Sequence, residues 1–383
     1  MTSAPEKTQS PQWIRQMDPP YYVNSTAISM NGERVIAGTF FFAYSPTGEY
    51  ETPALPKQFG TFCLDSHGNQ LWADKFQGVE GVYTVAISPS GGVAAAGGMI
   101  QPQTGFLRVY NANDGTQLAN YSAGARINQI ALSMDGGVIV AGADKVYLAE
   151  QRNGQFPQTP STFSVPTTTR NNVQSVSMPK DGSWFAVGDY AGTVYMIENN
   201  AGSVGMVYQS STGLLGTVHC VAAAALGDWF IAVGGDPVVY LFSTQSIQQG
   251  TYVDKFTLPA TGRVGWAAIS ATGETISVVQ NNGKAGVVYG LQNKGGKLSQ
   301  FWSQTTLANP NSTSLDAAGL QVTVADGYPD GTPGHFYLLN GTNGDPVWNY
   351  ETSNMSWPMF IDSFGDGIVA GSDNGDVYYF TPE

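Results

Sequence analysis

Apolar and polar positions alternate along this chain in short runs of four to seven residues, and glycine-containing pairs interrupt the runs. Residues 173–178 form one alternating run and are followed by an Asp181-Gly182 pair. Apolar runs over residues 184–188 and 193–197 come next. Runs of this length with such punctuation predict short antiparallel strands joined by tight hairpins.

The third run of each unit contains a recurring tyrosine between mostly apolar neighbours. Eight copies occur, with cysteine in place of tyrosine in the first, and they span 315 residues over seven intervals, a mean of 45. A fixed period of roughly 40 to 50 residues with strand signals in every unit is typical of a blade array. The central residues are Cys63, Tyr110, Tyr147, Tyr195, Tyr240, Tyr289, Tyr337 and Tyr378.

A fourth run carries a tryptophan in several copies, at Trp72, Trp302 and Trp348. Four strands repeated around a channel predict an all-β fold, an eight-bladed β-propeller with four antiparallel strands per blade. The last copy ends after its third run, and residues 11–16 resemble residues 346–351. We therefore expect the N-terminal strand to complete the last blade, which would leave no open sheet edge.

Composition is consistent with one propeller domain over residues 11–383 after a flexible segment, residues 1–10. Charged residues make up only 12% of the chain, and the net charge is −13. This balance argues against a nucleic-acid partner, because such interfaces need clustered lysine and arginine. No apolar run is long enough for membrane insertion. We expect a monomer, and a secreted or periplasmic location is slightly favoured over a cytoplasmic one.

The order of third run, polar turn with glycine and fourth-run tryptophan is clearest in residues 62–72 and 336–348. It resembles the repeat of the PQQ-like, or quinoprotein alcohol dehydrogenase-like, propellers, and residues 141–144 and 370–378 also resemble WD40-like repeats. The resemblance covers nearly the whole ring. It implies either a PQQ enzyme or a non-enzymatic member, such as the lipoproteins of outer-membrane assembly.

Residues needed for the enzymatic chemistry are missing. The resemblance to PQQ dehydrogenases would imply an adjacent cysteine pair, calcium ligands and an acidic base. Cys63 and Cys220 are far apart and fall in different blades, so we expect two buried free thiols. Of the three histidines, His67 falls on the face opposite His219 and His335, which argues against a metal site or a hydrolase triad. We therefore expect no cofactor and no metal, and the non-enzymatic branch is favoured.

Irregular connections indicate where function lies. Connections from second to third strand, and from one blade to the next, emerge on the same face of a propeller. The extended ones all belong to these two kinds, which predicts a binding face because loops on a rigid scaffold carry function. Tolerated drift in exposed loops is the alternative. The extended connections cover residues 39–59, 99–104, 154–170, 307–314 and 326–335.

The first extended connection is rich in aromatic residues, which supply contact area at low entropic cost. We predict that they bind a partner; the alternative is that the run folds over its blade and buries itself. The partner-binding candidates are Phe40, Phe41, Phe42, Tyr44 and Tyr50.

A second candidate site is an anion site at the channel mouth. Arg126 and Arg263 occupy the same repeat position, just before the first strand of their blades, and Arg170 lies close to that position. Three arginines near one rim would bind carboxylate or phosphate, unless each pairs with an acid between blades. Other ligand-binding candidates around the same mouth are His219, Trp266, Trp357, Tyr83, Asn24, Asn128 and Gln174.

Three functions remain open from the sequence. The first is a binding scaffold that engages a protein or polymer partner through the loop-bearing face. The second is a lyase or hydrolase that acts on an anionic substrate with Arg126, Arg170, Arg263 and His219. The third is a carbohydrate-binding propeller.

Overall fold

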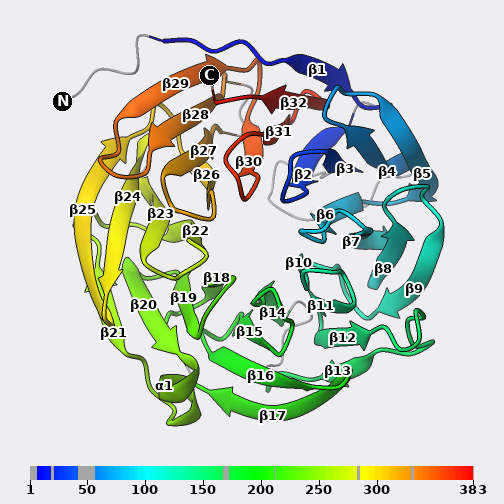
Figure 1. Cartoon of the computed structure of the whole chain (residues 1–383), viewed down its shortest axis with the longest axis horizontal. Helices are drawn as coiled ribbons and strands as arrows, with labels where there is room; N and C mark the ends of the chain where they lie inside the picture. Colours follow the sequence, from blue (N-terminus) through cyan, green and yellow to red (C-terminus); the bar gives the residue numbers. More distant parts are fainter. Residues whose placement is uncertain are drawn as a thin grey trace.

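The computed structural model describes residues 7–18, 21–41, 57–166, 172–211, 213–282, 285–328 and 332–382. Within those residues the strands form a closed ring of radial antiparallel sheets (Figure 1). Six sheets have four strands, and one has eight. The two halves of the larger sheet, β2–β5 and β6–β9, are joined through the pair Phe40↔Gly81. The predicted β-propeller is confirmed.

Innermost strands surround the central axis, and the second strands of the units lie next to them. The innermost strands are β2 (Tyr22–Ile28), β6 (Gly81–Ile87), β10 (Gln129–Leu132), β14 (Val173–Ser177), β18 (Val218–Ala223), β22 (Val264–Ile269), β26 (Pro310–Leu315) and β30 (Ser356–Ile361). The second strands are β3 (Arg34–Phe40), β7 (Val93–Gln101), β11 (Val138–Gly142), β15 (Trp184–Asp189), β19 (Trp229–Gly234), β23 (Thr275–Asn282), β27 (Gln321–Asp326) and β31 (Ile368–Ser372).

The third strands contain the recurring tyrosine or cysteine, as predicted, and the outer strands follow them. The third strands are β4 (Lys57–Asp65), β8 (Thr104–Asn111), β12 (Val146–Glu150), β16 (Val194–Asn200), β20 (Val238–Ser243), β24 (Ala285–Lys294), β28 (His335–Asn340) and β32 (Asp376–Phe380). The outer strands are β5 (Gln70–Gly78), β9 (Gln117–Ala123), β13 (Ser161–Phe163), β17 (Ser203–Gln209), β21 (Asp254–Thr257), β25 (Lys297–Thr305), β29 (Pro346–Glu351) and β1 (Trp13–Gln16).

The ring closes through the N-terminal strand. β1 pairs antiparallel with β32, so that Trp13 lies opposite Tyr379 and their rings stack with centroids 5.4 Å apart. This confirms the predicted closure. Part of the segment expected to be flexible lies outside the described residues; further along it, the Gln9 amide donates to the carbonyl of Asn349 on β29 at 3.2 Å. The chain therefore contacts two neighbouring sheets before its first turn (Figure 1).

The hydrophobic core lies between neighbouring sheets. One buried cluster, for example, combines Val140 and Leu148 of one sheet with Val173 and Val187 of the next. Close packing at this interface requires glycine at the end of several second strands. A Cβ at Gly188 would overlap the side chain of Val218 on the next innermost strand, and this demand accounts for part of the high glycine content.

Outer-strand tryptophans join neighbouring sheets. The indole nitrogen of Trp72 donates to the carbonyl of Ala112 at 2.9 Å, and that of Trp302 donates to Gly341 at 2.8 Å. Trp13 does the same to Ser66 at 2.8 Å. Each acceptor lies in or beside the connection from third to outer strand in the next sheet. Trp348 is fully buried and stacks on Phe380, with ring centroids 4.9 Å apart.

Three connections differ from the expectation. Residues 154–170 do not simply link two units, because Ser161–Phe163 form the outer strand β13 and pair with β12, so residues 154–160 connect a third strand to an outer strand.

Two other connections are shorter than expected. β7 extends to Gln101 and β8 begins at Thr104, with Gln101 paired to Thr104, so residues 99–104 form a tight hairpin. β26 begins at Pro310, which leaves a short link after β25. Both stretches continue the strands because their backbone groups pair in the ladder. The face on which these two shorter connections emerge is called the loop face below, and the opposite face is called the hairpin face.

Candidate functional site

A β-bulge recurs at one position of the innermost strands, close to the loop face. In β2, for instance, the register shifts between Val23 and Ser25, so that Asn24 has no partner in β3. A bulge re-aims the side chain of the extra residue. The extra residues in other strands include Tyr83, Gln174, His219 and Asn311, while Asn128 lies directly before β10. The sequence analysis therefore placed Asn24, Tyr83, Asn128, Gln174 and His219 correctly at equivalent positions of the inner rim.

Side chains at this bulge position donate hydrogen bonds to the next four-strand unit of the ring. The Asn24 amide donates to the carbonyl of Tyr83 at 2.9 Å, and the Asn128 amide donates to that of Val173 at 2.8 Å. His219 Nδ1 donates to the carbonyl of Val264 at 2.9 Å. Burial lowers the pKa of His219, and the nearby Arg263 lowers it further. His219 is therefore a neutral link between sheets at neutral pH.

Backbone amides on the free edge of the innermost strands are satisfied in a related way. The Ser25 hydroxyl accepts from the Val85 amide at 2.9 Å, and the Ser175 hydroxyl accepts from the Val221 amide at 2.8 Å. An edge strand otherwise presents unpaired polar groups. Much of the polar lining that sequence reasoning assigned to a ligand thus holds the ring together.

The two predicted arginines that the structure describes, Arg126 and Arg263, do not converge on one point. Arg126 lies over the ring of Tyr83, with 3.9 Å from Cζ to the ring centroid, and its NH1 is 3.7 Å from Oε1 of the buried Glu80. Arg263 is exposed and precedes β22, which lies across the ring from β10 and Arg126 (Figure 1). Arg170 lies outside the described residues. The arginine beside β10 therefore pairs with an acid, the alternative left open by the sequence.

Aromatic side chains from neighbouring sheets form an arc along the inner rim of the loop face. We define the aromatic arc as Trp357, Tyr22, Phe41 and Tyr83, all of which are half-buried. The rings of Tyr22 and Phe41 are 6.1 Å apart and nearly parallel. The buried Phe40 packs edge-on against Tyr83 at 5.3 Å and so anchors the arc from below.

Cations and a carboxyl group border this arc. The ammonium of Lys57 lies 3.6 Å from the ring centroid of Phe41, and Arg126 covers Tyr83. At the other end the Trp357 indole donates to Oδ1 of Asp373. Burial raises the pKa of Asp373 to about 7 despite that hydrogen bond. The arc therefore combines flat apolar surface with cations on one side and a carboxyl group of raised pKa on the other.

The remaining predicted site residues do not belong to a single site. The candidates Phe42, Tyr44 and Tyr50 lie outside the described residues. Of the aromatic run, Phe40 is buried and Phe41 is half-buried. Trp266 lies in β22 and packs against the hydrophobic clusters on both sides of its sheet. Gln174 is half-buried and already has an interaction partner within the protein.

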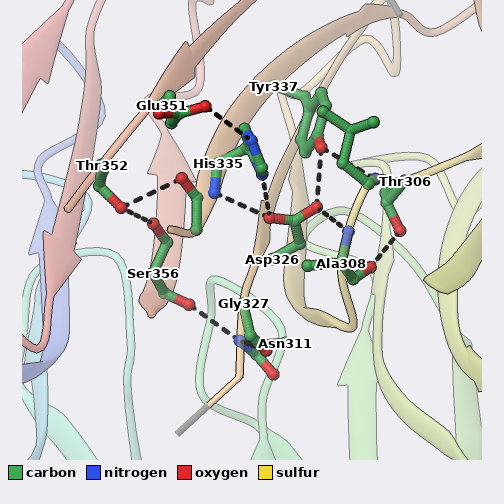
Figure 2. A network of polar contacts seen from close by, with 12 residues as sticks. Thr306, Ala308, Asn311, Asp326, Gly327, His335, Tyr337, Glu351, Thr352 and Ser356 are labelled. Carbon is green, nitrogen blue, oxygen red and sulfur yellow. Dashed lines mark hydrogen bonds and ion pairs between the residues drawn. The ribbon is translucent and has the colours of Figure 1, made fainter. Parts of the chain in front are cut away.

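A polar network around Asp326 lies beneath the loop face and was not predicted from the sequence (Figure 2). The fully buried Asp326 ends β27 and accepts hydrogen bonds from the Tyr337 hydroxyl at 2.7 Å and from His335 Nδ1 at 2.9 Å. It also accepts from the backbone amides of His335 and Ala308 at 2.8 Å. His335 Nε2 lies 3.6 Å from Glu351 Oε2.

Tyrosine and aspartate are paired in the same manner in other sheets. The hydroxyl of Tyr147 donates to Asp144 at 2.8 Å, and that of Tyr195 donates to Asp189 at 3.0 Å. In these three sheets the recurring tyrosine therefore marks a carboxylate partner as well as a strand, and Asp189 and Asp326 are fully buried. Although burial lowers the pKa of His335, the stronger combined effect of Asp326 and Glu351 raises it above its usual value.

The described residues include two free cysteines and no metal-ligand cluster. No cluster of three or more histidine, cysteine or acidic side chains could hold a metal ion there. Cys63 and Cys220 are free and buried, as predicted, and burial raises the pKa of both thiols to about 12. None of the described helical residues forms a helix long and apolar enough to cross a membrane.

Comparison with known proteins identifies the fold but not a family. No family model and no curated protein sequence matches the chain. Among solved structures, Sqt1 of Chaetomium thermophilum bound to the N-terminus of the ribosomal protein L10 is 14% identical, with a TM-score of 0.71. The alignment covers 94% of this chain and 97% of that one. Unbound Sqt1 gives a TM-score of 0.72 at 14% identity over 94% and 95% of the two chains.

A second propeller is also similar. The β-propeller domain of Myceliophteria thermophila Cps50 (Swd1) is 11% identical with a TM-score of 0.60, over 78% of this chain and 96% of that one. The similarity to these two proteins supports a WD40-like propeller fold. It gives no support to the resemblance to quinoprotein-like propellers. The chain thus has the fold of a WD40-like β-propeller.

Proposed function

We propose that this chain is a binding scaffold that takes a protein segment on the aromatic arc of its loop face. The observation that carries the proposal is the arc itself, in which half-buried rings of Trp357, Tyr22, Phe41 and Tyr83 come from neighbouring sheets. Tyrosine, tryptophan and arginine are the residues most enriched at protein-binding hot spots. Such rings contribute apolar contact area and lose little conformational freedom on binding.

Charge favours a protein over a nucleic acid. The net charge of −13 repels phosphate backbones, whereas a protein segment can meet both the aromatic surface and the charged groups of either sign that border it. Sqt1, which resembles this chain in fold, is bound in its structure to the N-terminus of a ribosomal protein. That precedent supports a protein segment as the ligand class of a propeller of this shape.

Catalysis at the inner rim is less well supported. Asn24, Asn128 and His219 direct their polar groups at backbone carbonyls of the next sheet. The guanidinium group of Arg126 already stacks on Tyr83 and faces Glu80. A carbohydrate is the second candidate ligand, because the nearly parallel rings of Tyr22 and Phe41 offer flat faces on which sugar rings stack.

We also infer that the ring has eight blades, with the halves β2–β5 and β6–β9 counted separately. β2 lies beside β6 as β22 lies beside β26, which is the contact between separate sheets elsewhere in the ring. Among the described residues, the link between the halves is one register pair. An experimental structure with seven blades would contradict this count.

Site-specific photo-cross-linking tests the proposed function. A benzoylphenylalanine at Phe41 should cross-link one defined protein from an extract of the native cells. The same group at Phe301 serves as the matched control, because Phe301 lies on an outer strand and is 39% exposed. Adding Tyr22→Ala should weaken the cross-link. Equal labelling from both positions would overturn the proposal, and binding to a glycan array in place of a protein would favour the carbohydrate.

A further inference from the structure

The single helix among the described residues interrupts the repeat on the hairpin face. α1 (Thr244–Gln248) stands between β20 and β21, where other units have a turn. Ser243 caps its first turn, and its own backbone amide donates a hydrogen bond to the Ser246 hydroxyl at 3.0 Å. The fully buried Ile247 anchors the helix against its surroundings. α1 projects at the rim of the ring beside β16 and β17 (Figure 1).

A cavity of about 320 Å³ lies beside this helix, between the sheets β14–β17 and β18–β21. Its apolar floor consists of Trp184 and Met196, which are 7% and 2% exposed. Thr244 and Gln248 line the cavity from α1. The volume is at the lower end of the range for small-ligand sites, roughly 300 to 1,000 Å³.

Two carboxylates line the same cavity without a compensating cation. Glu198 lies at the end of β16, and the exposed Asp228 lies in the turn before β19. Glu198 Oε1 accepts a hydrogen bond from the Tyr208 hydroxyl at 3.3 Å. Among the described residues neither carboxylate forms an ion pair, and no lysine or arginine lines the cavity. The electrostatic potential of the cavity therefore favours a positive charge.

The apolar floor distinguishes between kinds of cation. A small inorganic ion would gain nothing from Trp184 and Met196, whereas an alkyl chain packs on such surface while its charged head reaches the acids. Leu226, in the same turn as Asp228, is 68% exposed and extends the apolar surface outward. We propose that this cavity binds an alkylammonium or guanidinium group, as carried by the lysine or arginine side chain of a partner or by a free polyamine.

This site is independent of the proposed function on the loop face. α1 and the turn at Asp228 belong to the hairpin face, whereas the aromatic arc lies on the opposite one. A failure of either proposal therefore leaves the other standing, because the two are tested with different probes and different variants.

Methionine-methyl NMR offers a direct test with the full chain. The probe is N-acetyl-lysine methylamide, and its norleucine analogue, which lacks the amine, is the matched control. The lysine compound should shift the Met196 methyl signal saturably and leave that of Met359, a buried residue on β30 in a different sheet, unchanged. The norleucine compound should give no saturable shift. Spermidine is titrated in parallel, and the tighter of the two amines identifies the source of the cation.

Variants decide whether the acids bind the probe. Glu198→Gln and Asp228→Asn should each weaken binding by about threefold to fivefold, the size expected for a partly exposed charge pair. Asp135→Asn, at an exposed acid on a different hairpin, should leave binding unchanged. Thermal unfolding of each variant verifies the fold. Equal binding of the lysine and norleucine compounds, or unaltered lysine binding in the Glu198→Gln/Asp228→Asn double variant, would overturn the proposal.

Discussion

The indole nitrogen of Trp302 lies 2.8 Å from the carbonyl oxygen of Gly341 on the next sheet. Trp348 occupies the corresponding place in the following outer strand, but its indole nitrogen has no hydrogen-bond partner within the described residues. The reason is the ring closure: β1 reaches β32 from the other end of the chain, so no hairpin supplies an acceptor carbonyl at that junction.

This difference predicts unequal effects of the same substitution. Trp302→Phe should lower the free energy of unfolding by about 1 kcal/mol more than Trp348→Phe, since only the former leaves a carbonyl without its donor. Both changes remove the same atoms, so each serves as the control for the other. Urea denaturation measures the two values, and equal losses would contradict the explanation.

The two arginines at one repeat position should respond differently to loss of charge. Arg126→Met should destabilise the protein by about 2 to 3 kcal/mol, because it removes the cation facing the buried Glu80. Arg263→Met should cost less than about 0.5 kcal/mol, since that side chain is exposed. Thermal or urea unfolding gives both numbers. A larger loss of unfolding free energy in the Arg263 variant would contradict this prediction and indicate that Arg263 has a structural role.

Stability should fall with rising pH through His335. Its pKa is raised in the folded state by Asp326 and Glu351, so the imidazolium stabilises the fold fully below the unfolded value of about 6.5. That contribution is lost as the pH rises through the higher folded pKa. In His335→Gln the loss should be absent, which flattens the stability profile above about pH 6.5 by on the order of 1 kcal/mol. Urea unfolding at several pH values compares the two proteins.

Asp373 should contribute a second pH dependence in a lower window. Its folded pKa of about 7 exceeds the unfolded value, so the folded state holds a proton that the unfolded state has released. Stability is therefore lost as the pH rises from about 4 to 7. Asp373→Asn retains an acceptor for the Trp357 indole and should be more stable than the native protein at pH 8, by on the order of 1 kcal/mol. At pH 4 the two should unfold alike.

The regular part of the fold is readable from the sequence because local pattern determines it. Tyr195 lies between apolar neighbours, its copies recur at a mean spacing of 45 residues, and this pattern predicts the strand directly. The resemblance of residues 11–16 to residues 346–351 likewise located the closure. Connection lengths were harder to predict, since the pairing of Gln101 with Thr104 depends on how far the ladder continues.

The positions of several inner-rim residues could be predicted from the sequence, but their hydrogen-bond partners could not. His219 was placed correctly at the inner rim, yet its partner is a carbonyl 45 residues away in the next sheet. Such contacts depend on the spatial register between sheets, which no local pattern encodes. The tyrosine-aspartate pairs were not predicted for a related reason, because the spacing between the two residues varies. Asp144 lies 3 residues from Tyr147, whereas Asp326 lies 11 residues from Tyr337. Without a constant spacing the pairing has no sequence signature.

The side-chain links between sheets give the ring a direction. Asn24, Asn128 and His219 each donate to the unit that follows them in the chain. Ser25 and Ser175 accept from the following unit in the same sense. At each of these junctions the linking side chain belongs to the earlier unit and its backbone partner to the later one. The circle of units is complete only when β1 pairs with β32.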